Sequence, residues 1–412
     1  MAKTSRKAVD VIVLGAGAAG LMCAFTAARR GLKVLVLEKA NKVGKKILMS
    51  GGGRCNFTNY SVDAGNFISG NPHFCKSALS QFTQWDFIEL VKQHGIDYEE
   101  RKHGQLFCLN SANDVLAMLL QECEQSAVEI KTHCQLKSVS ALSAQDDKRY
   151  RVSLIQADGE SGNQLELDCH SLVVATGALS VPTLGGSDIG YVIAEQFNLP
   201  LTPRRAGLVP FMFSDSMQPL CERLSGCSLE VEVTCNGSQF AENLLFTHRG
   251  ISGPAILQIS NYWFPGDEIE INLLPGIDVG EWIQQRKQQQ GKTRLKTALS
   301  QLLPKSLVGE LEKLCWPEHA ETAMAEFSDK RLLEIAEKLG HWRLKPSATE
   351  GYRTAEVTLG GVDTAGISSK TMQARQQDGL YFVGEVLDVT GHLGGYNFQW
   401  AWSSGFCAGQ NV

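Results

Sequence analysis

Three glycines and one acid near the start of the chain have the spacing of a nucleotide-binding loop. Gly15, Gly17 and Gly20 follow an apolar run at residues 9–14, and Glu38 ends the next apolar run. The first glycine permits a tight turn, the second lets a pyrophosphate approach the backbone, and the third lets a helix pack closely on the sheet. An acid at this distance accepts hydrogen bonds from ribose hydroxyls. The pattern therefore predicts a dinucleotide site, and Glu38 disfavours the 2′-phosphate of NADP there.

A strand, a helix and a second strand must position these residues. Residues 9–14 form a continuous apolar run, which is typical of a buried parallel strand. The helix is expected from about residue 17 to residue 30, with Gly31 as its C-terminal stop. Its N-terminus would offer free N–H groups and a partial positive charge to phosphates. Residues 33–37 are the expected second strand.

Composition limits the class of protein. The chain has 412 residues, of which 43% are hydrophobic and 20% charged, so it is long enough for two or three globular domains. The formal net charge of −5 argues against a general nucleic-acid binder. None of the twelve cysteines forms a CxxC pair, so we expect buried free thiols, no metal site and a cytoplasmic location. No apolar stretch beyond residues 11–28 reaches membrane length, and the glycine spacing there favours the nucleotide loop.

Changes in pattern along the chain predict an inserted region. Residues 134–142, 149–157 and 164–169 alternate as a small antiparallel meander does, before a continuous apolar strand at 171–175. Short strands are expected between residues 200 and 275, and polar helices between 281 and 340. The chain then returns to buried strands near 354–359 and 380–384 and to a terminal helix at 396–409. The expected fold class is therefore α/β, with a Rossmann-like domain interrupted by an insertion.

Two further segments are predicted to converge with the glycine loop on one flavin. The strand at residues 172–174 ends in Ala175-Thr176-Gly177, which resembles the crossover motif of flavoproteins with two dinucleotide-binding folds. The strand at 379–383 ends in Gly384-Glu385, and in such flavoproteins an acid at this place binds the ribityl or pyrophosphate side of the cofactor. Either segment alone could be an ordinary core strand followed by a turn. Their order around the glycine loop favours a common site.

Four longer motifs stand out: Gly51-Gly52-Gly53-Arg54-Cys55-Asn56, the segment from Phe246 to Pro254, Thr358-Leu359-Gly360-Gly361-Val362, and Gly384-Glu385-Val386-Leu387-Asp388 with Gly394-Gly395-Tyr396-Asn397. Together they resemble the BaiN/YhiN-like bacterial flavoproteins, which are usually described as FAD-dependent or NAD(P)/FAD-dependent oxidoreductases. The resemblance covers nearly the whole chain. One departure is Thr371-Met372-Gln373-Ala374, where such proteins often have a Thr-Met-Glu-Ser segment, so a carboxylate contact there is in doubt.

The resemblance implies an FAD-binding domain at residues 1–195 and 354–412. It implies a β-barrel-like domain at 196–278 and 341–353, which carries a small helical domain at 279–340. The residues predicted to bind the cofactor are Gly15, Gly17, Ala18, Ala19, Gly20, Glu38, Lys39, Lys46, Gly53, Arg54, Cys55, Asn56, Leu136, Ala175, Thr176, Gly177, Gly384, Glu385, Gly394, Gly395, Tyr396 and Asn397.

Catalytic residues are less clearly marked. His392 lies beside the glycines expected near the flavin ring, and His248 lies in a Thr-His-Arg-Gly turn; either could donate a proton or be an ordinary loop residue. Cys55 could be redox-active, but no second cysteine is near it in sequence, which favours a packing role. Arg54 could complement a pyrophosphate or attract an anionic substrate, whereas the nearby lysines could equally be a solvated basic loop.

The function predicted from these residues is that of an FAD-dependent oxidoreductase with a noncovalent flavin and a small-molecule substrate. No second glycine-rich fingerprint occurs in residues 200–350, so NAD(P)H could bind only transiently near the flavin ring. Two alternatives stay open: a flavin-binding protein or sensor without turnover, and an RNA-modifying flavoprotein. The acidic net charge speaks against the second alternative.

Overall fold

The computed structural model describes residues 6–143, 145–158, 161–214 and 216–412. The chain divides into two compact units, of which the first comprises Met1–Arg205 and Val357–Val412 and the second Ala206–Glu356. The flavin motifs are on both sides of the second unit in sequence, so that unit is an insertion into the first. The finer division of the insertion into a barrel-like and a helical domain stays a prediction.

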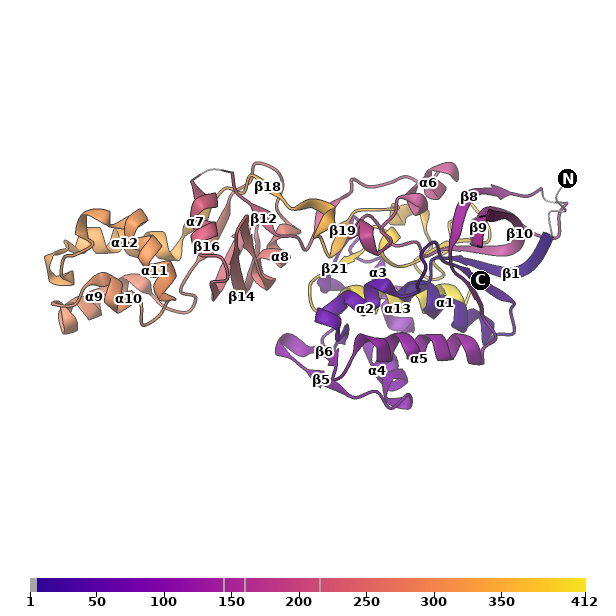
Figure 1. The fold of residues 1–412 in the computed structure, drawn as a ribbon, viewed down its shortest axis with the longest axis horizontal. Coiled ribbons are helices and arrows are strands. Elements are labelled where there is room, and N and C mark those ends of the chain that lie inside the picture. The colour runs from indigo at the N-terminus through magenta and orange to yellow at the C-terminus, as the bar shows by residue number, and fades with distance from the viewer. Residues whose placement is uncertain (1–5, 144, 159–160, 215) are drawn as a thin grey trace. The chain divides into compact units, whose positions relative to one another are not determined.

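The first unit is built on a mixed sheet of seven strands in the order β7-β2-β1-β10-β9-β8, with β20 paired to β10 (Figure 1). β1 pairs in parallel with both β2 and β10, as a dinucleotide-binding fold requires. The strands are β1 (Arg6–Leu14), β2 (Val34–Leu37), β7 (Glu129–Lys131), β8 (Cys134–Ala141), β9 (Tyr150–Asp158), β10 (Ser161–Val174) and β20 (Leu380–Phe382).

Strand β10 differs from the sequence prediction, which gave one strand at 164–169 and another at 171–175. The structure has a single strand of 14 residues. Its first part pairs antiparallel with β9, and its end, Leu172–Val174, lies between β1 and β20 in parallel register. Since no glycine or proline interrupts residues 163–174, nothing in the sequence breaks the strand where its pairing partners change.

Helices cover this sheet, and α1 packs against α13, the C-terminal helix. Residues 76–94 have the apolar spacing of one helix, but the structure has two there, α3 and α4. Thr83 caps the second, because its side chain accepts from the backbone N–H of Asp86. The helices of the first unit are α1 (Ala18–Ala28), α2 (Lys45–Met49), α3 (Cys75–Gln81), α4 (Gln84–Gln93), α5 (Ala112–Gln125), α6 (Ile189–Gln196) and α13 (Tyr396–Gly409).

Smaller strands complete the first unit. A three-stranded sheet contains β3 (Asn56–Asn59), β6 (Gln105–Cys108) and β5 (Tyr98–Glu100), and β4 (Phe67–Ile68) pairs with β21 (Thr390–Gly391). β19 (Val357–Leu359) also belongs to this unit. These short strands hold the segments that follow the predicted flavin motifs.

The second unit contains an antiparallel sheet in the order β17-β16-β13-β14-β15-β12-β18, and its helices α9 to α12 lie in sequence between β16 and β17. Its strands are β12 (Phe211–Met212), β13 (Ser228–Cys235), β14 (Ser238–Thr247), β15 (Gly250–Ser252), β16 (Ile269–Asn272), β17 (Trp342–Leu344) and β18 (Ala348–Thr349). β11 (Arg205–Gly207) spans the point in the sequence where the first unit ends and the second begins. Its helices are α7 (Met217–Arg223), α8 (Pro254–Ser260), α9 (Val279–Gln290), α10 (Leu295–Leu299), α11 (Lys305–Cys315) and α12 (Asp329–Gly340).

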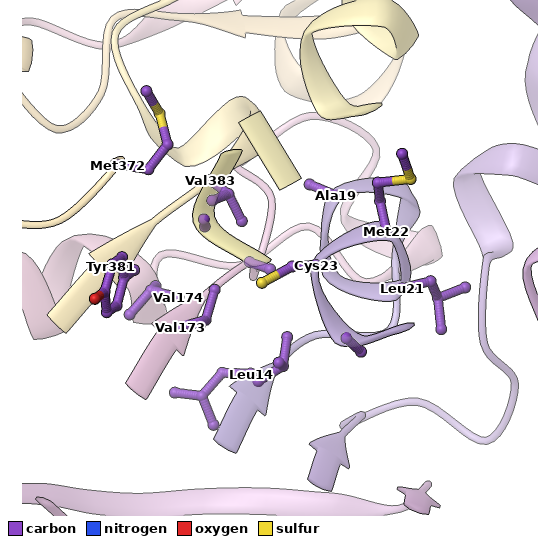
Figure 2. Packing of buried hydrophobic residues seen from close by; sticks show 14 of the residues in the cluster. Leu14, Ala19, Leu21, Met22, Cys23, Val173, Val174, Met372, Tyr381 and Val383 are labelled. Atoms are coloured by element: carbon purple, nitrogen blue, oxygen red, sulfur yellow. The ribbon is translucent and has the colours of Figure 1, made fainter. Parts of the chain in front are cut away.

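Each unit has its own hydrophobic core. In the first, apolar side chains of α1, such as Cys23, lie among those of the central strands, including Leu14, Val173 and Tyr381 (Figure 2). The burial of every residue of β2 explains its continuous apolar sequence. None of the described helices combines the length and apolar character that crossing a membrane requires.

Candidate functional site

The glycine loop between β1 and α1 packs against the end of β10. Gly15 has φ +106°, and a Cβ there would lie 2.4 Å from the carbonyl oxygen of Ala175. A Cβ at Gly20 would lie 2.0 Å from the carbonyl oxygen of Gly15, so α1 approaches the turn as closely as the fingerprint requires. At Gly17, by contrast, nothing lies within 4 Å of the added atom. The loop is therefore crowded toward the sheet and open at its tip.

The open tip and the start of α1 fit a pyrophosphate. Gly17 is the N-cap of α1, its backbone is extended, and no side chain caps the helix. The first turn, which includes Ala18 and Ala19, carries no acid. Gly177, just beyond Ala175 and Thr176, also has open space around an added Cβ. Free N–H groups, a helix dipole and space together suit an anion of this size.

Two backbone N–H groups fix the orientation of the Glu38 carboxylate. One carboxylate oxygen accepts from the backbone N–H of Ala16 at 2.9 Å, and the other accepts from Ala40 at 2.7 Å. The carbonyl of Glu38 accepts from Cys134 N–H at 2.9 Å, which brings the start of β8, and hence the neighbourhood of Leu136, to this edge. An oriented carboxylate with lone pairs to spare is what two ribose hydroxyls need. The adjacent Lys39 is exposed.

A polar cluster joins Lys46 on α2 to Glu385. The Lys46 Nζ donates to the Glu385 carboxylate and to Ser180 Oγ, both at 2.7 Å. Glu385 also accepts from Ser180 Oγ at 2.7 Å and from the backbone N–H of Thr358 at 2.9 Å. The segment carrying Glu385 lies beside α1, since a Cβ at Gly384 would be 3.0 Å from the Cβ of Ala19. Two predicted cofactor residues, far apart in sequence, thus meet close to the glycine loop.

Sequence reasoning missed Ser180 and Thr358 as members of this cluster. Both are fully buried, and Thr358 Oγ1 accepts from the backbone N–H groups of Leu179 and Ser180 at 3.1 Å. A signal was present for Thr358, which opens one of the motifs that carry the family resemblance. Ser180 stands three residues after the glycine of the crossover motif, and its type alone gave no such signal.

The turn before α13 is packed tightly against β3. A Cβ at Gly395 would lie 2.4 Å from the carbonyl oxygen of Thr58. Asn56 satisfies its neighbours when its amide oxygen faces Gly395 and accepts that residue's N–H at 3.1 Å. The Asn59 amide donates to the carbonyl of Gly394 at 3.0 Å. These contacts leave no room for a side chain at Gly395, so a larger residue there would displace the turn itself.

In this structure the side chains of Asn397 and Tyr396 contact other residues of the first unit. The amide of Asn397 accepts from the Gly391 N–H at 2.8 Å and donates to its carbonyl at 2.7 Å, which fixes the segment before the turn. Tyr396 is buried, and its ring packs edge-on against Phe67. Any cofactor contact of these two residues stays a prediction. The backbone N–H groups at the start of α13 have no side-chain cap.

The loop that contains Cys55 does not present a reactive thiol. Cys55 is fully buried, and burial raises the pKa of its thiol to about 12. The thiol is therefore protonated at neutral pH, which favours the packing role. Its neighbour Arg54 is exposed and contacts the Glu99 carboxylate at 3.3 Å, and Gly53 is half-buried. Arg54 thus has a weak partner that an anionic ligand could displace.

The two histidine candidates lie in different units. The backbone of His392 donates to the carbonyl of Asn66 at 2.9 Å, and burial lowers the pKa of its imidazole. His392 is therefore a neutral side chain at neutral pH. His248 is exposed on the turn between β14 and β15 of the second unit, and its role stays a prediction. Among the described residues, no group of histidines, cysteines and acids is arranged to hold a metal ion.

Comparisons with known proteins identify a family and several relatives. Residues 9–411 match the family described as HI0933-like protein Rossmann domain. The chain is 48% identical over 404 residues to the ribosomal RNA dihydrouridine synthase of Escherichia coli strain K12, with 98% of each chain covered. It is 29% identical over 415 residues to the 3-dehydro-bile acid delta(4,6)-reductase of Clostridium scindens, with 97% of each covered. Among solved structures it resembles a 3-ketosteroid-delta4-(5alpha)-dehydrogenase from Rhodococcus jostii RHA1, at 14% identity and a TM-score of 0.50, over 99% of this chain and 98% of that one.

Proposed function

The chain belongs to the HI0933-like family of Rossmann proteins, and from this premise we propose that it reduces uracil bases of ribosomal RNA to dihydrouracil. The observation that carries the proposal is the identity of 48% over 98% of both chains to a relative with that activity in its name. Identity at this level over the whole length leaves no domain of the relative unaccounted for.

The chain is a bacterial FAD-dependent oxidoreductase with a Rossmann fold and a noncovalent flavin. The glycine loop, the start of α1 and Glu38 would hold the pyrophosphate and adenosine ribose. The Lys46–Glu385 pair would face the next part of the same cofactor. The FAD supplies two-electron reduction when it is bound and reduced.

Dihydrouracil formation suits this chemistry. Carbon 6 of uracil is the end of a double bond conjugated to the carbonyl at carbon 4, so it accepts a hydride, and carbon 5 then accepts a proton. With NAD(P)H as the proposed electron donor, one NAD(P)H, one proton and one uridine give NAD(P)⁺ and dihydrouridine. Cys55 and His392 are both neutral at neutral pH, so neither supplies a charged acid there.

The expectation that nucleic acid is not a partner rested on the net charge alone. A net charge of −5 argues against a protein that binds any nucleic acid through its overall field, but it does not weigh against one locally basic surface. The relative named for ribosomal RNA therefore outweighs that expectation in this proposal.

A second candidate is reduction of a steroid-like enone, because the bile-acid reductase is 29% identical over 97% of both chains. Both candidates reduce a carbon–carbon double bond conjugated to a carbonyl. They differ in everything that surrounds that bond: one substrate is a polyanion, and the other is a small apolar molecule.

The test uses the purified flavoprotein with NADH or NADPH and ribosomal RNA transcribed in vitro, which carries no modification. Digestion of the RNA and mass spectrometry of its nucleosides would reveal a uridine heavier by two hydrogens. A 3-oxo-4-ene steroid serves as the competing substrate. If the RNA gains no dihydrouridine while the steroid is reduced, the ribosomal RNA proposal fails and the second candidate takes its place.

A further inference from the structure

Charge is distributed unevenly along the second unit. Between residues 216 and 281 there are nine acids and two basic residues. Between residues 282 and 309 every charged residue is basic, and we call these residues the basic segment. Its charged members are Arg286, Lys287, Lys292, Arg294, Lys296 and Lys305.

The basic segment spans the end of α9, the whole of α10 and the start of α11. Arg286 stacks its guanidinium over the ring of Trp282, one helical turn earlier, at 5.3 Å from the ring centre. Trp282 is itself half-buried, and its helix buries Val279 and Ile283 toward the core of the unit. A planar cation held against a part-exposed aromatic ring is a common element of surfaces that bind single-stranded RNA.

Half of these cations are already paired with acids from other parts of the unit. The pairs are Lys287 with Asp329 at 2.7 Å, Arg294 with Glu321 at 2.6 Å and Lys296 with Glu312 at 2.6 Å. Within the described part of the chain, the remaining three have no carboxylate partner, and two of them, Lys292 and Lys305, are exposed. These three side chains thus keep positive charge that no ion pair of the described residues neutralises.

Two of the cations stand at helix N-termini, where positive charge is electrostatically unfavourable. Arg294 is the N-cap of α10 and Lys305 is the first residue of α11, and neither helix has an acid in its first turn. By contrast, α9 and α12 each begin with an acid, Glu281 and Asp329 respectively. Arg294 is compensated by its ion pair with Glu321, whereas Lys305 has no ion-pair partner among the described residues. Since positive charge at a helix N-terminus is electrostatically unfavourable, folding does not explain the placement of Lys305.

We propose that the basic segment binds the phosphate backbone of the ribosomal RNA substrate. The inference rests on the proposed function and adds a surface to it, in the second unit. A polyanion is the ligand that matches three unneutralised cations, one of which, Arg286, is stacked on an aromatic ring. The excess of acids in the preceding 66 residues repels the same polyanion, which favours binding at the basic segment over that part of the unit.

The test compares two double variants of the flavin-loaded full chain. K292A/K305A removes the two exposed, unpaired lysines of the basic segment, whereas K338A/K345A removes two lysines of the same unit that are equally exposed and lie outside it. Both lower the charge by two. Binding of in vitro transcribed ribosomal RNA is measured by filter retention between 50 and 300 mM salt, and dihydrouridine formation is measured in parallel.

We expect K292A/K305A to bind the RNA about 10-fold more weakly at low salt. The slope of log affinity against log salt should fall by roughly 1.5, as the loss of two phosphate contacts implies. The K338A/K345A control and the flavin content of both variants should match the parent. The inference is overturned if both variants lose affinity equally, or if the parent binds RNA without salt dependence. If the parent binds as expected but forms no dihydrouridine, the proposed function fails while the binding surface stands.

Discussion

Glycines with a positive φ angle have different roles in the two units. Gly15 in the first unit has φ +106°, and Gly237 in the β13–β14 hairpin of the second has φ +78°. An added Cβ at Gly15 would press into the carbonyl of Ala175, whereas at Gly237 it would meet nothing within 4 Å. The hairpin needs glycine only for its own turn. The first unit needs Gly15 also because the β1–α1 turn packs against the end of β10 there, and this packing positions the candidate site.

The largest expected effect tests this difference directly. Gly15→Ala places a Cβ 2.4 Å from the Ala175 carbonyl oxygen, so the β1–α1 turn must separate from β10. We expect the variant to purify without flavin. The absorbance ratio of flavin to protein measures this outcome.

The matched substitution Gly237→Ala costs only the strain of a left-handed alanine, about 1–2 kcal/mol. It should purify yellow, with the second unit less stable to urea. If Gly15→Ala keeps its full flavin content, crowding at the loop is not what positions the site. If Gly237→Ala loses flavin as well, the two units are not independent in the way that their separate cores imply.

A smaller effect is expected where the first unit binds the ribose. Glu38→Gln replaces a carboxylate that accepts from Ala16 and Ala40 by an amide with only one accepting atom. Loss of hydrogen bonds to a charged acceptor, about 1.5–3 kcal/mol in total, corresponds to FAD binding that is roughly 10- to 100-fold weaker. Fluorescence titration of the apoprotein measures this affinity. Lys39→Gln, at the exposed neighbour, is the control and should leave it unchanged.

Local signals predicted most of the fold. The fingerprint gave the ends of β1, α1 and β2 within three residues because glycine spacing and apolar runs act within one supersecondary unit. Strand β10 was divided wrongly because, on the edge opposite β1, its partner changes from β9 to β20 partway along, and pairing partners are not a local property. The break between α3 and α4 was missed although Thr83 and Asp86 form a capping box that sequence can reveal.

The candidate site was predictable only in part, for the same reason. Glu38 and the glycines follow from spacing along one segment. The Lys46–Glu385 contact joins residues 339 positions apart, and its partner Ser180 comes from a third segment. No periodicity carries that information, because it arises from how the strands of the sheet are ordered. The burial that makes Cys55 an unreactive thiol is likewise a tertiary property.

Two buried acids extend the comparison between the units to electrostatics. Asp388 in the first unit accepts from the Gly70 N–H at 3.0 Å, and burial, with Asp363 nearby, raises its pKa. Glu310 in the second unit is held by Arg223 at 2.8 Å and Lys313 at 2.7 Å, which lower its pKa. Folding thus makes Asp388 easier to protonate, whereas it stabilises the ionised carboxylate of Glu310.

The smallest expected effects follow from these opposite shifts. Because the pKa of folded Asp388 is raised, its contribution to stability is present below about 3.8 and is lost as pH rises through the folded pKa. Asp388→Asn should therefore gain stability relative to the parent between pH 4 and pH 7.

Because the pKa of Glu310 is lowered, its contribution is present above about 4.5 and is lost as pH falls through the folded pKa. Glu310→Gln should then be at its greatest disadvantage at pH 7. Each slope is limited to about 1.4 kcal/mol per pH unit, the value for one proton. Hydrogen exchange of peptides around the two residues, corrected for the intrinsic effect of pH, measures both trends. Parallel trends in the two variants would contradict the assignment of opposite pKa shifts to Asp388, which is buried and hydrogen-bonded, and to Glu310, which is ion-paired.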